Sequence, residues 1–353
     1  MTWYYPDSQF YAATLLRGDA QFSEIAQDAY GFRAMLHRWD AYLPLNVALP
    51  NIHENWNLPT THPPTAFLFA APVAFFSDAV AATVWAWICL AALFASLKLH
   101  GFNWIETTVF TLLSLFWLPT IGSLGQLTPI WLLGLSLGYF FRERNPFLAG
   151  VFIALASMTK FFPALLIIPF ITKRKWAALY AFILVWIFSL IFIYVLSPEI
   201  FNQYFQANMT ASPHFVKVSA NFIYASFRTY GLIGLIPPLA ILVGIFLSNW
   251  KDLINTKEIS TKTWMVFSLL AVALFPIIWG YSYFPLYPGM LMQSKEKQPS
   301  RIFGIMGLIF SSTPIPVIGM LLFGLGLTWP ASVTKTFIFK RVKMNHSDPN
   351  KEN

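Results

Sequence analysis

Long runs of apolar residues alternate with short polar breaks along most of this chain of 353 residues. Uniform runs of this kind are typical of helices in a bilayer, because a soluble helix carries a polar face. Nine runs are predicted to form helical segments: 79–97, 104–118, 128–141, 147–158, 161–171, 176–196, 232–247, 264–292 and 302–327. The pattern therefore predicts an all-α, polytopic integral membrane protein.

The composition agrees with this class, since 57% of the residues are hydrophobic and only 11% are charged. The net charge of +8 would also suit a nucleic-acid-binding protein. However, Lys and Arg form short clusters between the apolar runs, where such residues orient helices in the membrane. The single cysteine, Cys89, lies inside an apolar run, so no disulfide framework is expected. We expect membrane lipids, and no nucleic acid, as the surroundings of this chain.

Several apolar runs are shorter than the roughly 20 residues that a straight span requires. The basic clusters decide how such runs cross. Arg142 and Arg144 precede residues 147–171, and the cluster 173–175 follows them. A single crossing would place one cluster on the non-cytoplasmic side, against the positive-inside tendency. The region is therefore predicted to go out and return, with Lys160 at the outer turn.

The same rule applies to two later regions. Between Lys262 and Lys295 the predicted outer turn is 280–285, and between Arg301 and Lys340 it is 311–314. This arrangement leaves most of the 23 Lys and Arg residues on the cytoplasmic side.

The first 65 residues differ in kind, because they carry six acids against three Arg and contain no spanning run. We interpret 1–65 as a non-cytoplasmic loop region, 66–340 as the transmembrane helical bundle and 341–353 as a cytoplasmic polar tail. The start lacks the basic and apolar parts of a signal peptide, so a first transmembrane helix is expected to be missing from this sequence. The short apolar stretch 65–76 is predicted to be a re-entrant or interfacial helix.

Unusual polar residues gather at the non-cytoplasmic face in this arrangement. They are Asp7, His62, Gln126, Lys160, Asn221, Arg228, Tyr281 and Tyr283. Folding alone gives a membrane protein no reason to gather them there, whereas an enzyme with its active site at that face has one. Sequence signatures for zinc, nucleoside triphosphates and dinucleotides are missing from the chain, so we predict no cofactor and no metal ligand.

Several strings in this order resemble glycosyltransferase family 87, whose known members have the GT-C fold and use polyprenyl-phosphate-mannose. The strings are Asp7-Ser-Gln-Phe-Tyr-Ala-Ala with Leu15-Leu16-Arg17-Gly18, His62-Pro63-Pro64 before Ala71-Pro72, Gly125-Gln126, Gly150 to Lys160-Phe-Phe-Pro163, and Lys173-Arg174-Lys175-Trp176. The family usually has Tyr where this chain has His62, and often Pro where it has Phe161. The resemblance implies a GT-C type multi-helix bundle with an active-site loop on the outer face.

The resemblance and the chemistry of sugar transfer suggest roles for these residues. A base must take the proton of the acceptor hydroxyl, and the resemblance places it at Asp7, with Asp28 and Asp40 as alternatives. Lys160 is predicted to bind the donor phosphate, because a lysine between apolar arms is costly unless it is paired or functional. A snorkelling lysine is its structural alternative. Arg228 is a second candidate for that phosphate.

Five further residues are predicted to bind the substrate, each with an ordinary structural alternative such as a helix cap, a turn or an aromatic belt. They are His62, Gln126, Asn221, Tyr281 and Tyr283.

The expected function is transfer of a hexose, mannose by resemblance, from a polyprenyl phosphate carrier to a lipid or glycan acceptor. The enzyme is expected to span the cell (inner) membrane many times, with its site on the non-cytoplasmic side. It is expected to invert the anomeric carbon, because one base acts without a covalent intermediate. Every predicted cytoplasmic segment is too short for a nucleotide-sugar domain, which favours a lipid-borne donor. The alternative is a lipid or sugar transporter or flippase, which would place ionisable residues near the midplane of repeated halves.

Overall fold

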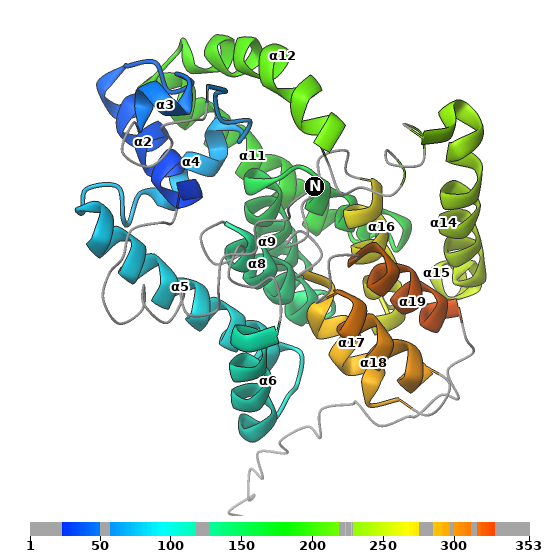
Figure 1. The fold of residues 1–353 in the computed structure, drawn as a ribbon. Helices are drawn as coiled ribbons and strands as arrows, with labels where there is room; N and C mark the ends of the chain where they lie inside the picture. Colours follow the sequence, from blue (N-terminus) through cyan, green and yellow to red (C-terminus); the bar gives the residue numbers. More distant parts are fainter. Residues whose placement is uncertain are drawn as a thin grey trace, which may run out of the picture.

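The structure is a computed structural model that describes residues 23–49, 57–117, 127–218, 223, 227, 229–274, 285–296, 300–311 and 316–328. Within these residues every regular element is a helix, and none is a strand (Figure 1). The all-α class predicted from the apolar runs is therefore confirmed.

Three helices of the N-terminal part lie together near one end of the molecule, beside α12 (Figure 1). They are α2 (Ser23–His37), α3 (Leu45–Ala48) and α4 (Pro64–Ala70). Gly31 of α2 lies so close to the Phe67 ring of α4 that a Cβ atom would be 2.6 Å from it. The small residue therefore allows these two helices to pack closely, and Phe67 is completely buried between them and their neighbours.

A run of consecutive helices forms much of the bundle. It contains α5 (Asp78–Leu99), α6 (Trp104–Trp117), α8 (Thr128–Phe141), α9 (Pro146–Thr159), η1 (Phe162–Ile167), α10 (Ile168–Thr172) and α11 (Trp176–Leu196). Helix α9 packs between α8 and α11. A Cβ atom at Gly150 of α9 would overlap the carbonyl oxygen of Ala178 in α11. Glycine at this position therefore sets the close approach of α9 and α11.

The remaining helices complete the bundle. They are α12 (Ile200–Val218), η2 (Gly231–Leu235), α14 (Ile236–Ser248), α15 (Trp250–Asn255), α16 (Thr261–Leu274), α17 (Tyr287–Ser294), α18 (Ser300–Ser311) and α19 (Pro316–Thr328). Helices α18 and α19 pack closely against each other, as the predicted hairpin requires. The apolar runs did not predict α12, because polar residues such as Asn202 and Gln206 interrupt its sequence.

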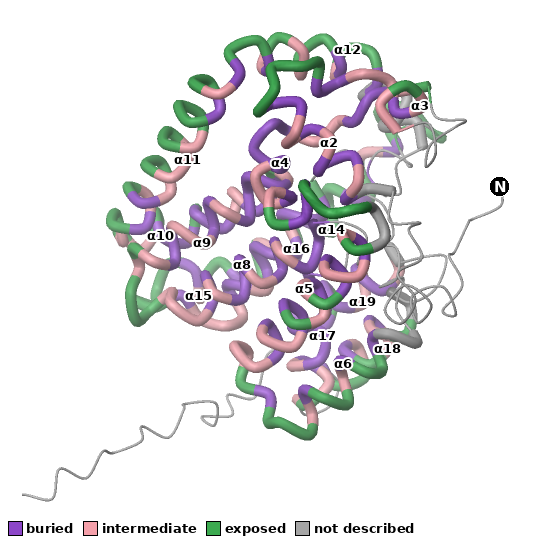
Figure 2. Tube along the Cα trace, turned by 90° about the vertical axis from the view of Figure 1, so that its left-hand side faces the viewer, coloured by how far each residue is buried: buried purple, intermediate pink, exposed green. Residues whose placement is uncertain are grey.

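Three helical stretches are long and apolar enough to cross a membrane: Val80–Leu99, Trp176–Leu196 and Gly231–Ser248. Of the most apolar window of α11, only 11% is buried inside the protein, which suits a helix that faces lipid. Figure 2 shows its exposed and half-buried residues along the outside of the bundle, whereas buried residues follow α8 and α9. Shorter apolar helices therefore form the core behind longer ones, and the fold is that of a helical membrane protein.

The hairpin predicted around Lys160 is confirmed by its two ends. Helix α9 stops at Thr159, and Lys160 has extended backbone angles of φ −151° and ψ 132°. After η1 and α10 the chain returns to the start of α9, where Lys175 Nζ lies 2.5 Å from Glu143 Oε2 and 3.2 Å from the Arg142 carbonyl oxygen. The basic residues on both sides of this region therefore share one end of the bundle.

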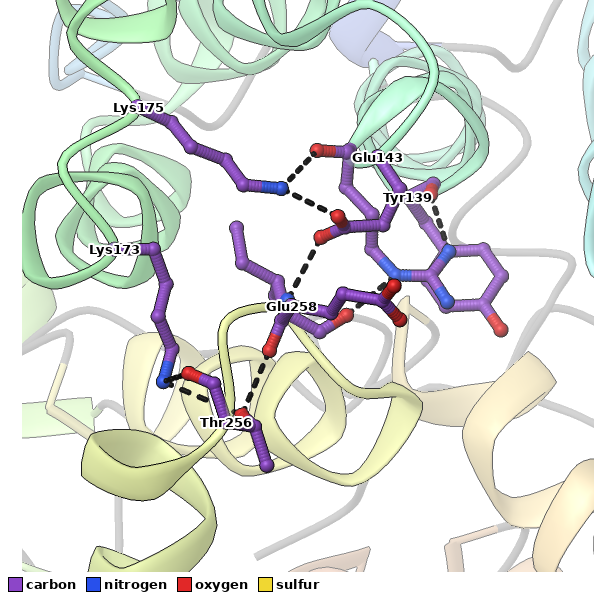
Figure 3. A network of polar contacts seen from close by, with 8 residues as sticks. Tyr139, Glu143, Lys173, Lys175, Thr256 and Glu258 are labelled. Atoms are coloured by element: carbon purple, nitrogen blue, oxygen red, sulfur yellow. Dashed lines mark hydrogen bonds and ion pairs between the residues drawn. The ribbon is translucent and has the colours of Figure 1, made fainter.

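That end, which we name the basic end, is held by a network of polar contacts that joins α8, α10, α15 and α16 (Figure 3). Arg142 Nε donates to the Ile259 carbonyl at 2.8 Å, and Glu143 Oε1 accepts from the Ile259 amide at 2.7 Å. Lys173 donates to the carbonyl oxygens of Leu253 and, at 2.6 Å, Thr256. The Lys173 contacts satisfy carbonyl oxygens at the C-terminal end of α15, where carbonyl groups lack partners within the helix.

Further contacts link Lys295 and His100 to residues near the basic end. Lys295 Nζ lies 2.6 Å from Glu106 Oε1. The His100 ring stacks on Tyr139, with 4.7 Å between the ring centroids. Trp264 of α16 and Gly289 of α17 line one small cavity together with His100, so these parts of the two helices lie near the basic end. The turn predicted at 280–285 lies outside the described residues except for its last residue.

Candidate functional site

A buried ion pair lies at the opposite end of α9 from the basic end. Asp28 Oδ1 of α2 is 2.8 Å from Nδ1 of His62, which lies just before α4. The Asp28 side chain is 0% exposed and that of His62 is 15% exposed. A buried carboxylate is costly unless it has a hydrogen-bonding partner, and His62 supplies one. This couple is named the Asp28–His62 couple below.

The backbone around His62 is also fixed on both sides. Its amide donates to Thr60 Oγ1 at 3.2 Å, and its carbonyl accepts from the Tyr42 hydroxyl at 2.8 Å. Pro63 then caps α4, and Pro64 begins it with a φ angle suited to the first helical turn. The ring of His62 is therefore held in place by Asp28 and by the backbone of its own turn.

Tyr42 is a buried residue whose chemistry supports this arrangement. Burial raises the pKa of its phenol well above the ordinary value, and the neighbouring Tyr204 and Asp28 raise it further. The phenol therefore stays protonated at neutral pH and remains a donor to the His62 carbonyl. Its ring packs on Phe67 and Tyr204, with centroid distances of 5.5 and 5.6 Å.

A direct hydrogen bond connects the start of α4 to the end of α9. The Thr65 hydroxyl donates to the Met158 carbonyl at 2.6 Å, and both residues are buried. Thr65 lies three residues after His62, and Met158 lies two residues before Lys160. The half-buried Lys160 therefore belongs to the same end of the bundle as the Asp28–His62 couple. The 14 residues of α9 place this end about 20 Å from the basic end.

Helix α11 contacts the Lys160 end of α9 from the lipid-facing side of the bundle. Trp186 Nε1 donates to Ser157 Oγ at 2.9 Å, and its ring stacks on Phe161 with 5.7 Å between centroids. Phe161 occupies the position directly after Lys160. The backbone turn that carries Lys160 is thus fixed from α4 and from α11.

One oxygen of Asp28 has no hydrogen-bond partner among the described residues. This atom, Oδ2, is buried, while Oδ1 contacts His62. A buried acceptor without a hydrogen-bond partner lowers the free energy of unfolding by about 1–3 kcal/mol. The presence of such an atom at Asp28 therefore calls for an explanation beyond packing. The alternative acid, Asp40, lies in an exposed turn, where its Oδ1 accepts from the Tyr42 amide at 2.9 Å.

Six of the predicted site residues lie outside the described residues. They are Asp7, Gln126, Asn221, Arg228, Tyr281 and Tyr283. Among the residues that are described, no group of three or more His, Cys, Asp or Glu side chains is arranged to hold a metal ion. Sequence reasoning missed Tyr42 and Thr65, because a single Tyr or Thr in a short loop carries no recognisable signal.

The fold and this cluster define the chain as a helical membrane protein with a polar site at one end of its bundle. The family model of glycosyltransferase family 87 matches residues 61–282, which is more than half of the chain. The chain therefore belongs to glycosyltransferase family 87 and is a membrane glycosyltransferase. No curated protein and no solved structure matches it. The matched stretch includes His62 and Lys160, whereas Asp7, Asp28 and Asp40 precede it.

Proposed function

We propose that the enzyme transfers a hexose, mannose in this proposal, from a polyprenyl phosphate to a lipid or glycan acceptor at the non-cytoplasmic face of the membrane. The observation that supports the proposal is that Lys160 and the Asp28–His62 couple lie at the same end of the bundle, at the end of α9 away from the basic end. A lysine and a histidine at one end of a bundle suit a negatively charged phosphate.

The proposed reaction is a single displacement. The acceptor oxygen forms a bond to the anomeric carbon while the bond from that carbon to the phosphate oxygen breaks. Asp7 takes the acceptor proton, and the departing phosphate keeps the electron pair. Lys160 and Arg228 balance the charge that develops on this phosphate. Because the acceptor enters opposite the leaving group, the anomeric configuration inverts.

The remaining candidates are assigned to the substrates. In this proposal His62, Gln126 and Asn221 contact the phosphate or the sugar hydroxyls, and Tyr281 and Tyr283 stack on the sugar or guide the lipid. The exposed apolar surface of α11 beside the Lys160 turn gives a polyprenyl chain a bilayer-facing surface to follow.

A transfer assay tests this proposal. Membranes that contain the enzyme would be incubated with radiolabelled polyprenyl-phosphate-mannose, and the labelled lipids and glycans would be identified. We expect a labelled product that membranes with the Lys160→Met variant form much more slowly. The control replaces the lipid-linked donor with GDP-mannose under conditions that block its conversion to lipid-linked mannose. This control should give no labelled product. Failure of every polyprenyl-phosphate-hexose to label a product would refute the proposed donor class.

A labelling experiment tests the side of the membrane. Cysteines introduced at Ser123 and Ser282 should react with an impermeant thiol reagent added from outside, whereas one at Asn145 should not. The native Cys89 is buried and should contribute little background. Labelling at position 145 alone would reverse the proposed orientation.

A further inference from the structure

We infer that helix α12 lies in the membrane surface at the Lys160 end of the bundle, with one edge among lipid acyl chains and the other edge in water. The partner of its apolar edge is therefore the lipid leaflet at that end. This inference goes beyond the proposed function, because it is independent of the reaction that the enzyme performs.

The outward side of α12 divides into an apolar edge and a polar edge. Residues four positions apart lie one above the other on a helix. At this spacing, the apolar edge consists of Phe201, Phe205 and Met209, and the polar edge of Asn202, Gln206 and Thr210. Phe205 is 68% exposed and Met209 is 80% exposed. Single exposed apolar residues are ordinary, whereas an apolar row beside a polar row is typical of a helix between lipid and water.

A third face of α12 packs against the protein and fixes which edges face outward. Ile200 is completely buried in the same cluster as residues of α2 and α4. Gln203 Oε1 accepts from the Ala41 amide at 3.2 Å. The Tyr204 ring packs on that of Tyr42, with 5.6 Å between the centroids. The helix is therefore held on the part of the bundle that carries the Asp28–His62 couple.

The position of α12 along the chain sets its level in the membrane. Helix α11 begins directly after the basic cluster 173–175, and its 21 residues measure about 31 Å, close to the thickness of the hydrocarbon layer. A spanning helix of this length ends at the opposite surface, and only residues 197–199 separate it from α12. Figures 1 and 2 show α12 turning away from the end of α11 and running across the end of the bundle.

Exposed apolar residues continue from the last turn of α11 into α12. Tyr194 is 59% exposed and Val195 is 65% exposed, which suits the same lipid-facing side of the bundle. The apolar edge of α12 therefore follows a surface that already faces lipid.

The chemistry of α12 favours acyl chains over a charged or a protein partner. Residues 200–216 contain no Asp, Glu, Lys or Arg, so attachment depends on apolar insertion and does not require anionic lipid. A stable protein interface buries about 800 Å² on each partner, which is more than one edge of a helix offers.

Spin labels on single cysteines test the inference. Cys89, the single native cysteine, would be replaced by alanine, and a nitroxide would be attached at Phe205→Cys or Met209→Cys. Gln206→Cys is the matched control on the polar edge, and Ile187→Cys in α11 is the deep reference. The full chain would be placed in phosphatidylcholine vesicles. Collisions of each nitroxide with oxygen, which concentrates in the bilayer, and with a water-soluble nickel chelate would then be measured.

The two edges should give opposite results. Labels at positions 205 and 209 should favour oxygen and lie about 5–10 Å below the headgroups, shallower than the label at position 187. The label at position 206 should favour the nickel chelate. Equal access of the chelate to both edges would show that α12 stands in water and would overturn the inference. Shielding of the apolar edge from both reagents would also overturn it, because that edge would then contact protein, such as a second copy of the chain.

Hydrogen exchange gives a second measurement without labels. Phe205→Ser combined with Met209→Ser should let α12 leave the lipid, so its backbone amides in vesicles should exchange at least about ten-fold faster. Asn202→Ser combined with Gln206→Ser is the matched control, because it places the same residue at two exposed positions of the polar edge. The control should exchange like the wild type. Equal exchange in the two double variants would contradict insertion of the apolar edge.

Discussion

The two ends of the bundle use carboxylates in different ways. At the basic end, Glu143 uses both oxygens, one for the Ile259 amide and one for Lys175 (Figure 3). At the other end, Asp28 uses one oxygen for His62, and its second oxygen has no hydrogen-bond partner among the described residues. The Glu143 side chain is 29% exposed, whereas that of Asp28 is 0% exposed.

This difference agrees with our proposal that the network at the basic end holds helices together and that the other end serves the reaction. Lys173 and Glu143 satisfy backbone groups of the α15–α16 connection, and a partly exposed network of this kind is sufficient for that purpose. A buried, partly satisfied carboxylate costs stability, and such groups persist mainly where function requires them. Substitutions at the basic end should therefore affect folding, and those at the other end should affect turnover.

The largest effect is expected from Asp7→Asn, which would show whether the base lies with the Asp28–His62 couple or apart from it. Asparagine keeps the size of the side chain but cannot take a proton, so transfer should fall by roughly 10² or more. Binding of the lipid donor should remain. Single-turnover rates with labelled donor would measure this loss. Normal turnover in Asp7→Asn, with a complete loss in Asp28→Asn, would show that the base had been assigned to the wrong residue.

Lys160→Met should give the next largest effect, because a cation that balances the departing phosphate matters most in the transition state. We expect kcat to fall roughly ten-fold to 10²-fold, and to fall by a larger factor than KM for the donor rises. Lys160→Arg should keep part of the activity, since it retains the charge. The control is Lys173→Met at the basic end, which should lower thermal stability and leave kcat of the folded enzyme unchanged. Wild-type turnover in Lys160→Met would return this residue to a structural role.

Gly150→Ala tests the close packing of α9 against α11, the two helices that run from the basic end toward the Lys160 turn. The added methyl group would overlap the Ala178 carbonyl, so the helices must separate, at a cost of about 1–3 kcal/mol. Gly244→Ala in α14 is the matched control, because a Cβ atom there meets no other atom within 4 Å. It should be neutral or slightly stabilising, as expected for alanine in a helix. Thermal unfolding in one detergent would compare the two variants, and equal stability would contradict the close packing of α9 and α11.

Glu143→Gln should have the smallest effect. It removes the charge that pairs with Lys175 but keeps an oxygen that can accept from the Ile259 amide. Since the pair is partly exposed, we expect a loss of about 1 kcal/mol or less and no change in kcat. Thermal unfolding and transfer assays on the same sample would measure both. A large loss of activity at constant stability would place the basic end in the catalytic machinery.

Much of the fold follows from local patterns in the sequence. The run 176–196 coincides with α11, and the basic residues around 147–171 predicted the turn at Lys160. These features depend on hydrophobicity and charge, which can be read from neighbouring residues. Helix α12 was missed because its polar positions give it no long apolar run.

The candidate site could be predicted only in part. Lys160 was predicted from its position in a hairpin, and His62 was predicted from its place among the polar residues of the non-cytoplasmic face and from the family resemblance. The contact between Asp28 and His62 joins residues 34 positions apart, and no local pattern encodes it. It depends on the packing of α2 against α4, which Gly31 permits. Tertiary packing therefore buries Asp28 and leaves Asp40 exposed, a difference that the local sequence does not reveal.

Because α11 is longer than α9, the two helices should respond differently to the thickness of the membrane. The 21 residues of α11 measure about 31 Å, close to the thickness of the hydrocarbon layer, whereas α9 has only 14 residues. A thicker or thinner membrane would therefore act first on α11, by changing its tilt. Because α11 contacts α9 at Gly150 and stacks on Phe161 beside Lys160, that tilt would be passed to the turn. Lipid acyl-chain length would therefore influence the position of Lys160, the residue that we propose binds phosphate, relative to the membrane surface.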